Sequence, residues 1–327
     1  MHPVLAEQQE RAYALLPPEV HNYYAGGAGE QTTLGEAQDA WRSVRLRPHV
    51  LRDVSAVDTT TTLLGTVLDA PVLVGPTAAH GLAHPDGERT TALGTAAAGG
   101  LLVLSTRSSL PLEQVPAGPW WFQAYVMRER SRTLDLVHRA AAAGASAVVL
   151  TGDVPWLGAR HGATRAQLTA PLQPGEAQDP SAGLEAIGEL AGAGLPVLVK
   201  GVLRADDALA CLDAGAAGLV VSNHGGRQLD RAVATAHALP EVASAVDGRA
   251  PVLVDGGIRS GLDVLCALAL GADAVLLGRP VLWALAAGGA RGVEQCLRAV
   301  RDDLAHVMGL AGARSLGEVG PDLLAAV

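Results

Sequence analysis

The chain is poor in lysine, cysteine and aromatic residues. Only Lys200 is lysine among 24 basic residues, and aromatic residues make up 3% of the sequence. The three cysteines, Cys211, Cys266 and Cys296, lie in alanine- and leucine-rich segments without metal-ligand spacing, and their odd number excludes complete disulfide pairing. We expect buried thiols and no metal site.

Long hydrophobic runs and basic clusters are also lacking. The longest apolar runs have the length of strands, and the first residues include acidic side chains, so neither a membrane span nor a secretory signal is expected. The net charge of −9 argues against nucleic acid as the main partner. These absences predict a cytoplasmic protein, although local basic pockets could still bind small anions.

What the sequence does contain is a repeating unit: a short apolar run, a polar turn and an alanine-rich helical stretch. The runs are mostly continuous rather than alternating, as in strands buried on both faces. Eight such units predict an α/β fold with one (β/α)8 TIM barrel. A doubly wound open sheet is the alternative, but no GxGxxG follows the first strand. The expected strands are residues 71–77, 101–106, 121–125, 147–153, 196–201, 218–225, 251–257 and 274–280.

We expect a single domain over residues 1–327, with an N-terminal helical and irregular segment (1–70), the barrel (71–316) and a tail (317–327). A helix is predicted over 6–16, and Pro18 suits the first turn of a second helix that ends at Tyr23 and Tyr24. A flexible AGGAG segment would follow. Residues 41–70 are expected to form irregular connections and a small hairpin that closes the bottom of the barrel.

The stretch SNHGGRQLD (222–230) carries the most chemistry, because a buried run leads directly into it. His224 can move a proton near neutral pH, and Arg227 offers a planar fork for a carboxylate or phosphate. Other strand ends also carry polar side chains, and a barrel brings all of these ends to one face. They include Thr77, Ser105, Thr106, Gln123, Tyr125, Thr151, Asp153, Lys200, Ser222, Asn223 and Asp255.

The last two units predict a phosphate site. DGGIRSG (255–261) and GRP (278–280) each lead into a helix, so that backbone N–H groups, Arg259 and Arg279 would converge. Gly256, Gly257 and Gly278 would let the backbone approach the anion closely.

These motifs resemble the FMN-dependent 2-hydroxy acid oxidases and dehydrogenases, such as glycolate, lactate and mandelate oxidases. The resemblance runs from Tyr23 to about Leu316, and SNHGGRQLD is its most specific part. Segments in the same order as in that family are PTAAHGLAHP, WFQAY, LTGDVPWLGAR, LVKG, LVDGGIRSG and LLGRP.

The resemblance implies oxidation of an L-2-hydroxy acid to a 2-oxo acid with FMN as cofactor and oxygen or another electron acceptor. It implies that His224 takes a proton from the substrate, that Asp153 stabilises the imidazolium and that Tyr125 bonds the substrate oxygen. Tyr23, Arg160 and Arg227 would bind the substrate carboxylate. The flavin would be held by Thr77, Ala78, Ala79, Ser105, Gln123, Thr151, Lys200 and Ser222, and its phosphate by Asp255, Gly256, Gly257, Arg259, Gly278 and Arg279. Relatives often form tetramers, so a homo-oligomer is expected.

Three departures from the family pattern indicate a substrate larger than glycolate. The loop after the fourth strand is short, which favours an open pocket. Arg107 stands where glycolate oxidases have an aromatic wall residue; it either points to solvent or meets a polar group of the substrate. Ala79 replaces a bulkier residue, and Trp156 is expected to form a pocket wall. An aromatic 2-hydroxy acid is the first expectation, followed by a hydroxy or amino acid unit of a larger or carrier-bound intermediate.

Other classes remain open at this point. An FMN-dependent isomerase would use the same barrel without net oxidation. A NAD enzyme similar to IMP dehydrogenase would share DGGIRSG and the following ALALGADAVLLGR, but the lack of a cysteine at a strand end counts against it. A barrel that only binds phosphate ligands would not need the set of Tyr23, Tyr125, Asp153, His224 and Arg227.

Overall fold

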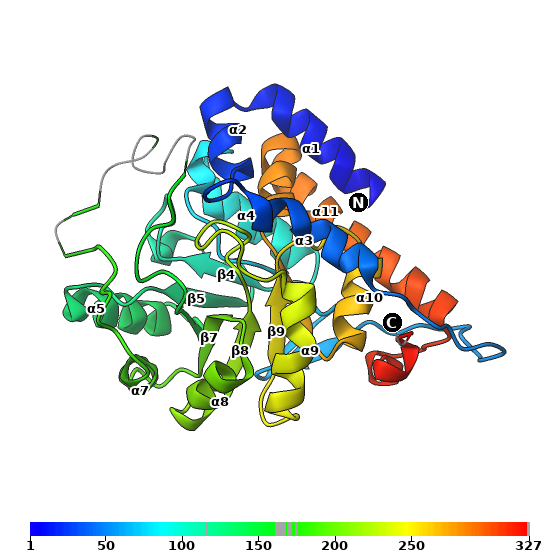
Figure 1. Cartoon of the computed structure of the whole chain (residues 1–327). Helices are drawn as coiled ribbons and strands as arrows, with labels where there is room; N and C mark the ends of the chain where they lie inside the picture. Colours follow the sequence, from blue (N-terminus) through cyan, green and yellow to red (C-terminus); the bar gives the residue numbers. More distant parts are fainter. Residues whose placement is uncertain (116, 161–167, 169–171, 174, 326–327) are drawn as a thin grey trace.

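Eight parallel strands close into a barrel in the computed structural model, which describes residues 1–115, 117–160, 168, 172–173 and 175–325 (Figure 1). The strands follow one another around the barrel in chain order, and β10 pairs with β3 to close it, with Val275 opposite Val72. The predicted (β/α)8 architecture is confirmed. The barrel strands are β3 (Val72–Val74), β4 (Leu102–Ser105), β5 (Trp120–Ala124), β6 (Val148–Thr151), β7 (Val197–Val202), β8 (Gly218–Val221), β9 (Val252–Asp255) and β10 (Ala274–Leu277).

The interior of the barrel changes character along each strand. Side chains alternate between the two faces of a strand, so residues two apart point the same way. Inward-facing apolar residues form one buried cluster, and in six strands a polar residue follows two positions later. These pairs are Val103 and Ser105, Trp121 and Gln123, Val149 and Thr151, Leu198 and Lys200, Val220 and Ser222, and Leu253 and Asp255.

A hairpin closes the N-terminal end of the barrel, as predicted. It consists of β1 (Thr61–Leu63) and β2 (Thr66–Leu68), which pair antiparallel. Leu63 and Leu68 are almost fully buried and belong to the same cluster as Leu73 and Trp121 inside the barrel. Apolar side chains therefore fill the bottom of the barrel and leave the opposite end for polar groups.

The outer faces of the strands pack against helices through a second, larger apolar cluster. The longest helix, α11, bends at Gly288 and Gly289, where the backbone leaves helical geometry. The covering helices are α4 (Gly87–Ala97), α5 (Arg130–Ala142), α7 (Glu185–Ala191), α8 (Ala205–Asp213), α9 (Thr235–Val246), α10 (Gly261–Ala269) and α11 (Arg279–Ala311).

Three further helices precede the barrel: α1 (Pro3–Leu15), α2 (Pro18–Ala25) and α3 (Thr32–Ser43). The first two agree with the predictions, and Pro18 is the first residue of α2. The third was missed, and the prediction of irregular structure from residue 41 is wrong for its last turn. Helices α1 and α2 lie against α11, and α3 lies against α9 and α10 (Figure 1). The AGGAG segment, expected to be flexible, packs on the turn after β8, where Ala28 donates to the Gly226 carbonyl over 2.8 Å.

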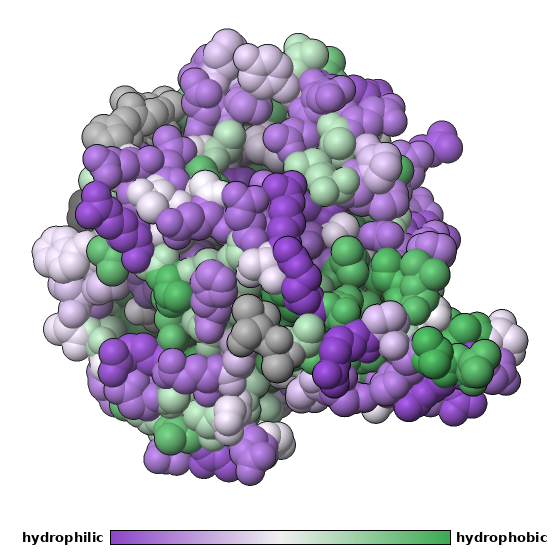
Figure 2. Space-filling view, turned by 45° about the vertical axis from the view of Figure 1, so that its right-hand side comes forward, coloured by the Kyte–Doolittle hydropathy of each residue, from purple (hydrophilic) through white to green (hydrophobic). Residues whose placement is uncertain are grey.

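The face of the molecule in Figure 2 is largely polar, with hydrophobic residues gathered mainly toward its lower right. In the described ranges no helix combines the length and the apolar character needed to cross a membrane. Short 3-10 turns complete the chain: His80–Leu82, Leu112–Gln114, Leu316–Glu318 and Pro321–Leu323.

Candidate active site

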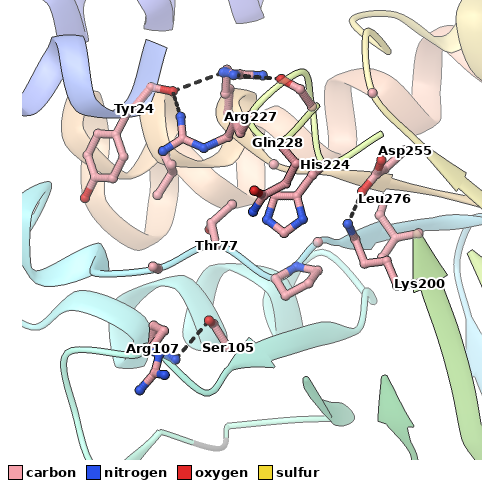
Figure 3. Close-up of a pocket in the computed structure, with 18 of the residues that line it drawn as sticks. Tyr24, Thr77, Ser105, Arg107, Lys200, His224, Arg227, Gln228, Asp255 and Leu276 are labelled. Atoms are coloured by element: carbon pink, nitrogen blue, oxygen red, sulfur yellow. Dashed lines mark hydrogen bonds and ion pairs between the residues drawn. The ribbon is translucent and has the colours of Figure 1, made fainter. Parts of the chain in front are cut away.

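A pocket of about 380 Å³ opens at the carboxyl ends of the barrel strands (Figure 3). Figure 3 shows His224 and Lys200 pointing into the same space, with Arg227 on one side and Arg107 and Ser105 on the other. The polar residues that line the pocket are Tyr23, Tyr24, Thr77, Ser105, Arg107, Tyr125, Arg160, Gln178, Lys200, His224, Arg227, Gln228, Asp255, Arg259 and Arg279. All of them except Tyr24, Gln178 and Gln228 were predicted from the sequence as site residues.

His224 and Asp153 form a hydrogen-bonded pair at this end of the barrel. The imidazole Nδ1 lies 3.0 Å from the Asp153 Oδ1, and both side chains are mostly buried. Asp153 can approach β7 because residue 201 is glycine; a Cβ there would fall 2.5 Å from the Asp153 Cβ. Burial favours the protonated carboxyl, but His224 and Lys200 outweigh it and hold the pKa of Asp153 below its usual value. Asp153 is therefore ionised at neutral pH.

This pairing determines which nitrogen of His224 can accept a proton. An ionised carboxylate only accepts hydrogen bonds, so Nδ1 must carry the hydrogen. Nε2 is then left with a free lone pair, and the Asp153 charge stabilises the imidazolium that forms when Nε2 is protonated. The pair can act as a general base.

Lys200 provides a buried positive charge next to this base. Its side chain donates to the Ser222 Oγ over 2.8 Å and lies 3.1 Å from the Asp255 Oδ2. Burial lowers the pKa of the ammonium, but Asp255 and Asp153 more than offset this and raise it. The same Ser222 hydroxyl accepts a hydrogen bond from the His224 backbone N–H over 3.0 Å, so one side chain holds both groups in place.

Gln123 connects three strands behind the pocket. Its Nε2 donates to the Thr151 Oγ1 over 2.9 Å, and its Oε1 accepts from the Ser105 Oγ over 3.2 Å. These bonds fix the orientation of the amide in a position that is 1% exposed. Gln123 and Thr151 therefore lie one layer behind the pocket surface, as do Asp153 and Ser222.

Four arginines surround the pocket without a carboxylate partner. Among the ion pairs of the described residues none involves Arg160, Arg227, Arg259 or Arg279. Burial lowers the pKa of all four, to about 10 for Arg227 and Arg259. A guanidinium nevertheless stays protonated in proteins, and uncompensated buried charge is costly. The site is therefore built to receive anions.

Backbone carbonyls rather than carboxylates hold two of these guanidinium groups. Arg227 Nη1 donates to the carbonyls of Tyr23, Tyr24 and Gly26, and Arg279 donates to those of Tyr24, Gly26 and Gly225. The end of α2 thus fixes these two arginine side chains.

The backbone at the expected phosphate site requires glycine. Gly256 and Gly257 have φ values of 90° and 83°, and a Cβ at residue 257 would fall 2.3 Å from the Ala37 carbonyl oxygen. The missed helix α3 therefore packs directly behind these two glycines, and Trp41 Nε1 donates to the Gly256 carbonyl over 2.7 Å.

Three sequence expectations need correction or refinement. Ala79 was expected to enlarge the pocket, but it is buried outside the pocket lining and adds no room. Trp156 was expected to form a pocket wall, but it is 70% exposed, and its neighbour Leu157 lines the pocket instead. Arg107 does not point to solvent; it is 9% exposed and its guanidinium lies over the Tyr125 ring at 5.8 Å. Part of the loop after β6 lies outside the described residues, but Leu172 and Gln178 line the pocket.

Some residues of the site were missed by the sequence reasoning. Gln228 directly follows Arg227, and its Oε1 accepts from the Gly158 N–H over 2.8 Å, which fastens the loop that carries Arg160. Its place inside SNHGGRQLD was the available signal. Tyr24, whose hydroxyl donates to the Ala79 carbonyl over 2.6 Å, gave no comparable signal beside Tyr23.

Fold and site together define a TIM-barrel enzyme with a general base and separate anion sites for a phosphate-bearing cofactor and an acidic substrate. The chain belongs to the FMN-dependent dehydrogenase family, whose model matches residues 12–189 and 175–326. It is 42% identical to glycolate oxidase 3 of Arabidopsis thaliana, with 96% of this chain and 93% of the relative covered. The 4-hydroxymandelate oxidase of Amycolatopsis orientalis is also 42% identical, with 96% and 95% covered.

Solved structures agree with this membership. A mandelate oxidase mutant with (S)-mandelic acid superposes with a TM-score of 0.92 at 42% identity, covering 98% of this chain and 97% of that one. A second structure of the same mandelate oxidase mutant contains an FMN adduct. The protein is therefore an FMN-dependent enzyme that oxidises 2-hydroxy acids.

The residues of the pocket fit FMN. A phosphate would supply a negatively charged partner for the guanidinium groups of Arg259 and Arg279, which burial disfavours. Gly256 and Gly257 would let the backbone come close to that phosphate. The Lys200 ammonium matches an isoalloxazine edge that becomes more negative on reduction.

Proposed function

We propose that the enzyme oxidises an aromatic, or otherwise large, L-2-hydroxy acid to the corresponding 2-oxo acid with oxygen as the electron acceptor. The observation that carries this proposal is the His224–Asp153 pair in a pocket lined by Arg160 and Arg227. The similarity to mandelate oxidases supports an aromatic substrate. Cytoplasmic location and homo-oligomeric assembly stay predictions from the sequence.

In this proposal His224 is the catalytic base. Its Nε2 takes a proton from the substrate, while Nδ1–H keeps donating its hydrogen bond to Asp153, whose charge stabilises the resulting imidazolium. Tyr125 would donate a hydrogen bond to the substrate oxygen. Burial and the nearby Asp153 raise the pKa of Tyr125, so its hydroxyl stays protonated for that purpose.

The substrate carboxylate would bind between Arg160 and Arg227, with Tyr23 beside them. Three carbonyls occupy Nη1 of Arg227 and fix the plane of its guanidinium. The Tyr23 ring lies 5.2 Å from the centre of that guanidinium, which supports it further. A fixed fork can hold a carboxylate in one orientation relative to the base.

Bound FMN supplies the acceptor of the two electrons that leave the substrate. Thr77, Ala78, Ser105, Lys200 and Asp255 line the pocket and would contact it directly. Behind them, Ala79, Gln123, Thr151 and Ser222 would hold these residues in place, and the phosphate would bind at Gly256, Gly257, Arg259, Gly278 and Arg279.

The proposal is tested by mixing the holoenzyme anaerobically with single 2-hydroxy acids and following the flavin absorbance. We expect loss of the absorbance with (S)-mandelate and 4-hydroxymandelate, slower loss with lactate and glycolate, and none with (R)-mandelate. Recovery on admitting air would support oxygen as acceptor. Absorbance that no 2-hydroxy acid changes would contradict the proposal and favour the isomerase alternative.

Arg107 and Glu176 support a neutral polar group at the far end of the substrate. Arg107 Nη2 donates to the Glu176 carbonyl over 2.6 Å, and Nη1 lies 3.9 Å from the Glu176 carboxylate. This pairing offsets part of the guanidinium charge. We expect Glu176→Gln to raise the kcat/KM ratio of 4-carboxymandelate to mandelate by roughly fivefold, within the range of a partly exposed ion pair. Arg107→Met, as the matched variant, should lower the same ratio; unchanged ratios in both variants would remove this assignment.

A larger or carrier-bound substrate is the second candidate. Trp156, Leu157 and Leu229 are 69–75% exposed, and the Gly158–Gln228 hydrogen bond keeps their two segments adjacent at the mouth of the pocket. Such an apolar rim suits a substrate that extends out of the barrel. A kcat/KM for N-acylated or thioester-linked hydroxy acids above that for mandelate would favour this candidate.

A further inference from the structure

Glu88 is a buried carboxylate that the proposed chemistry does not use. It lies in the first turn of α4, where the positive end of the helix favours a negative charge, and it is 1% exposed. Its Oε1 accepts hydrogen bonds from two backbone N–H groups, those of His80 at 2.9 Å and Ser109 at 2.8 Å. His80 and Ser109 belong to different turns, one after β3 and one after β4.

Further hydrogen bonds join the same two turns. The Ala79 N–H donates to the Arg107 carbonyl over 3.0 Å, and the Gly81 N–H donates to the Ser109 Oγ over 2.8 Å. The two turns are in close contact at this point, because a Cβ at residue 81 would fall 2.7 Å from the Ser109 hydroxyl oxygen. Glu88 is the one acidic side chain in this set of contacts, and it bonds to both turns at once.

The turn after β3 needs such support because its backbone is strained. Ala79 has φ 61° and ψ 48°, a left-handed conformation that is unfavourable for alanine. Its neighbours Thr77 and Ala78 line the pocket, and Arg107 lines it from the other turn. A shift of either turn would therefore displace the pocket wall.

We propose that Glu88 is a positioning residue for FMN binding, because its Oε1 fastens the turn 77–81 to the turn 105–109 and so places Thr77 and Ala78 against the cofactor. His80 completes the arrangement, since its imidazole lies 2.6 Å from the Thr77 Oγ1 and 2.8 Å from the Thr91 Oγ1. Burial lowers the pKa of His80 despite the adjacent Glu88, which keeps the imidazole neutral between the two hydroxyls.

The test measures FMN affinity of the full-length apoprotein by quenching of FMN fluorescence, without substrate or turnover. Glu88→Ala removes the acceptor for both N–H groups and should weaken FMN binding on the order of tenfold. Glu88→Gln keeps an acceptor oxygen of the same shape and should stay within about threefold of the wild type. Ser109→Ala, at an exposed position, should give an intermediate loss because it removes only the Gly81 bond.

Thr95→Ala is the matched control for general destabilisation. Thr95 is also 1% exposed on α4, but its hydroxyl bonds to the Thr91 carbonyl and not to either turn. It should lower the thermal midpoint while leaving FMN affinity unchanged. The proposal is overturned if Glu88→Ala binds FMN as the wild type does, or if Thr95→Ala loses as much affinity as Glu88→Ala. Because no hydroxy acid is present, these outcomes are independent of whether the proposed substrate is correct.

Discussion

The two ends of the barrel interior are built from the same strands in opposite ways. At the lower end, Leu73, Trp121 and Leu198 pack against the hairpin residues Leu63 and Leu68 in a cluster without charged groups. Two positions further along the strands, the inward residues include a lysine and an aspartate, followed by a histidine and a second aspartate. One end gains free energy from apolar burial, and the other accepts the cost of buried charge.

The residues that stabilise the fold and the residues that carry the reaction are therefore separated along the barrel axis. Substitutions at the lower end should alter unfolding without altering the reaction, and substitutions at the upper end should alter mainly the reaction and have only small effects on unfolding. Substitutions of His224, Leu68 and Asp153, with progressively weaker consequences, test that separation.

Replacing the base should have the largest effect. His224→Gln keeps a polar side chain of similar size but cannot accept the substrate proton. General base catalysis contributes about 10²–10⁴ in rate, so we expect flavin reduction by (S)-mandelate to slow about 10³-fold, equivalent to about 4 kcal/mol. The measurement is anaerobic stopped-flow absorbance.

The thermal midpoint of this variant should stay close to that of the wild type, since the separation places stability elsewhere. A lower thermal midpoint of His224→Gln together with an unchanged rate of flavin reduction would contradict this separation.

At the lower end, Leu68→Ala should cost stability only. Leu68 is 1% exposed in the hairpin, and truncation of a buried leucine typically costs about 2–5 kcal/mol. We expect the free energy of unfolding in urea to fall by about 3 kcal/mol, while the FMN dissociation constant and kcat remain unchanged. A matching loss of FMN affinity would show that the two ends are mechanically coupled.

The smallest effect concerns the pH dependence of Asp153. Its folded-state pKa lies below the ordinary value of 3.8, so the ionised side chain stabilises the fold above that pH, and the contribution is lost as the pH falls through the lower folded-state pKa. Urea unfolding at pH 6 and at pH 3 should therefore show that Asp153→Asn lies closer to the wild type at pH 3. The difference at pH 6 should be smaller than the loss in Leu68→Ala.

An unchanged difference between the two proteins at pH 6 and pH 3 would mean that the Asp153 charge adds no stability to the upper end. In that case its role would be restricted to orienting His224.

Local sequence patterns were sufficient to predict the barrel, because each strand is a continuous apolar run between turn residues. They were also sufficient for the strand-end residues, since the carboxyl ends of parallel strands must meet on one face. His224, Asp153 and Lys200 could therefore be grouped from the sequence alone, and the structure brings them together: Ser222 bonds to both Lys200 and His224, and His224 bonds to Asp153.

Features that depend on contacts between distant segments could not be predicted in this way. Helix α3 begins with two threonines, which are poor helix formers, and it is held by packing against the chain after β9. The roles of Glu88 and Tyr24 depend on turns 21 and 55 residues away, respectively, that carry no matching sequence signal. Arg107 was recognised as unusual, but its pairing with Glu176 required the folded chain.

The burial of Lys200 also determines how the protein responds to chemical labelling. It is the sole lysine of the chain and is 4% exposed, whereas Met1 is 42% exposed, so reagents that acylate amines find the N-terminal amine at the surface of the folded protein but no ε-amino group. Amine coupling to a sensor chip or to a dye should accordingly be directed to the N-terminal amine. Any acylation of Lys200 that does occur would report directly on opening of the flavin site, which makes a common labelling reagent a probe of that single position.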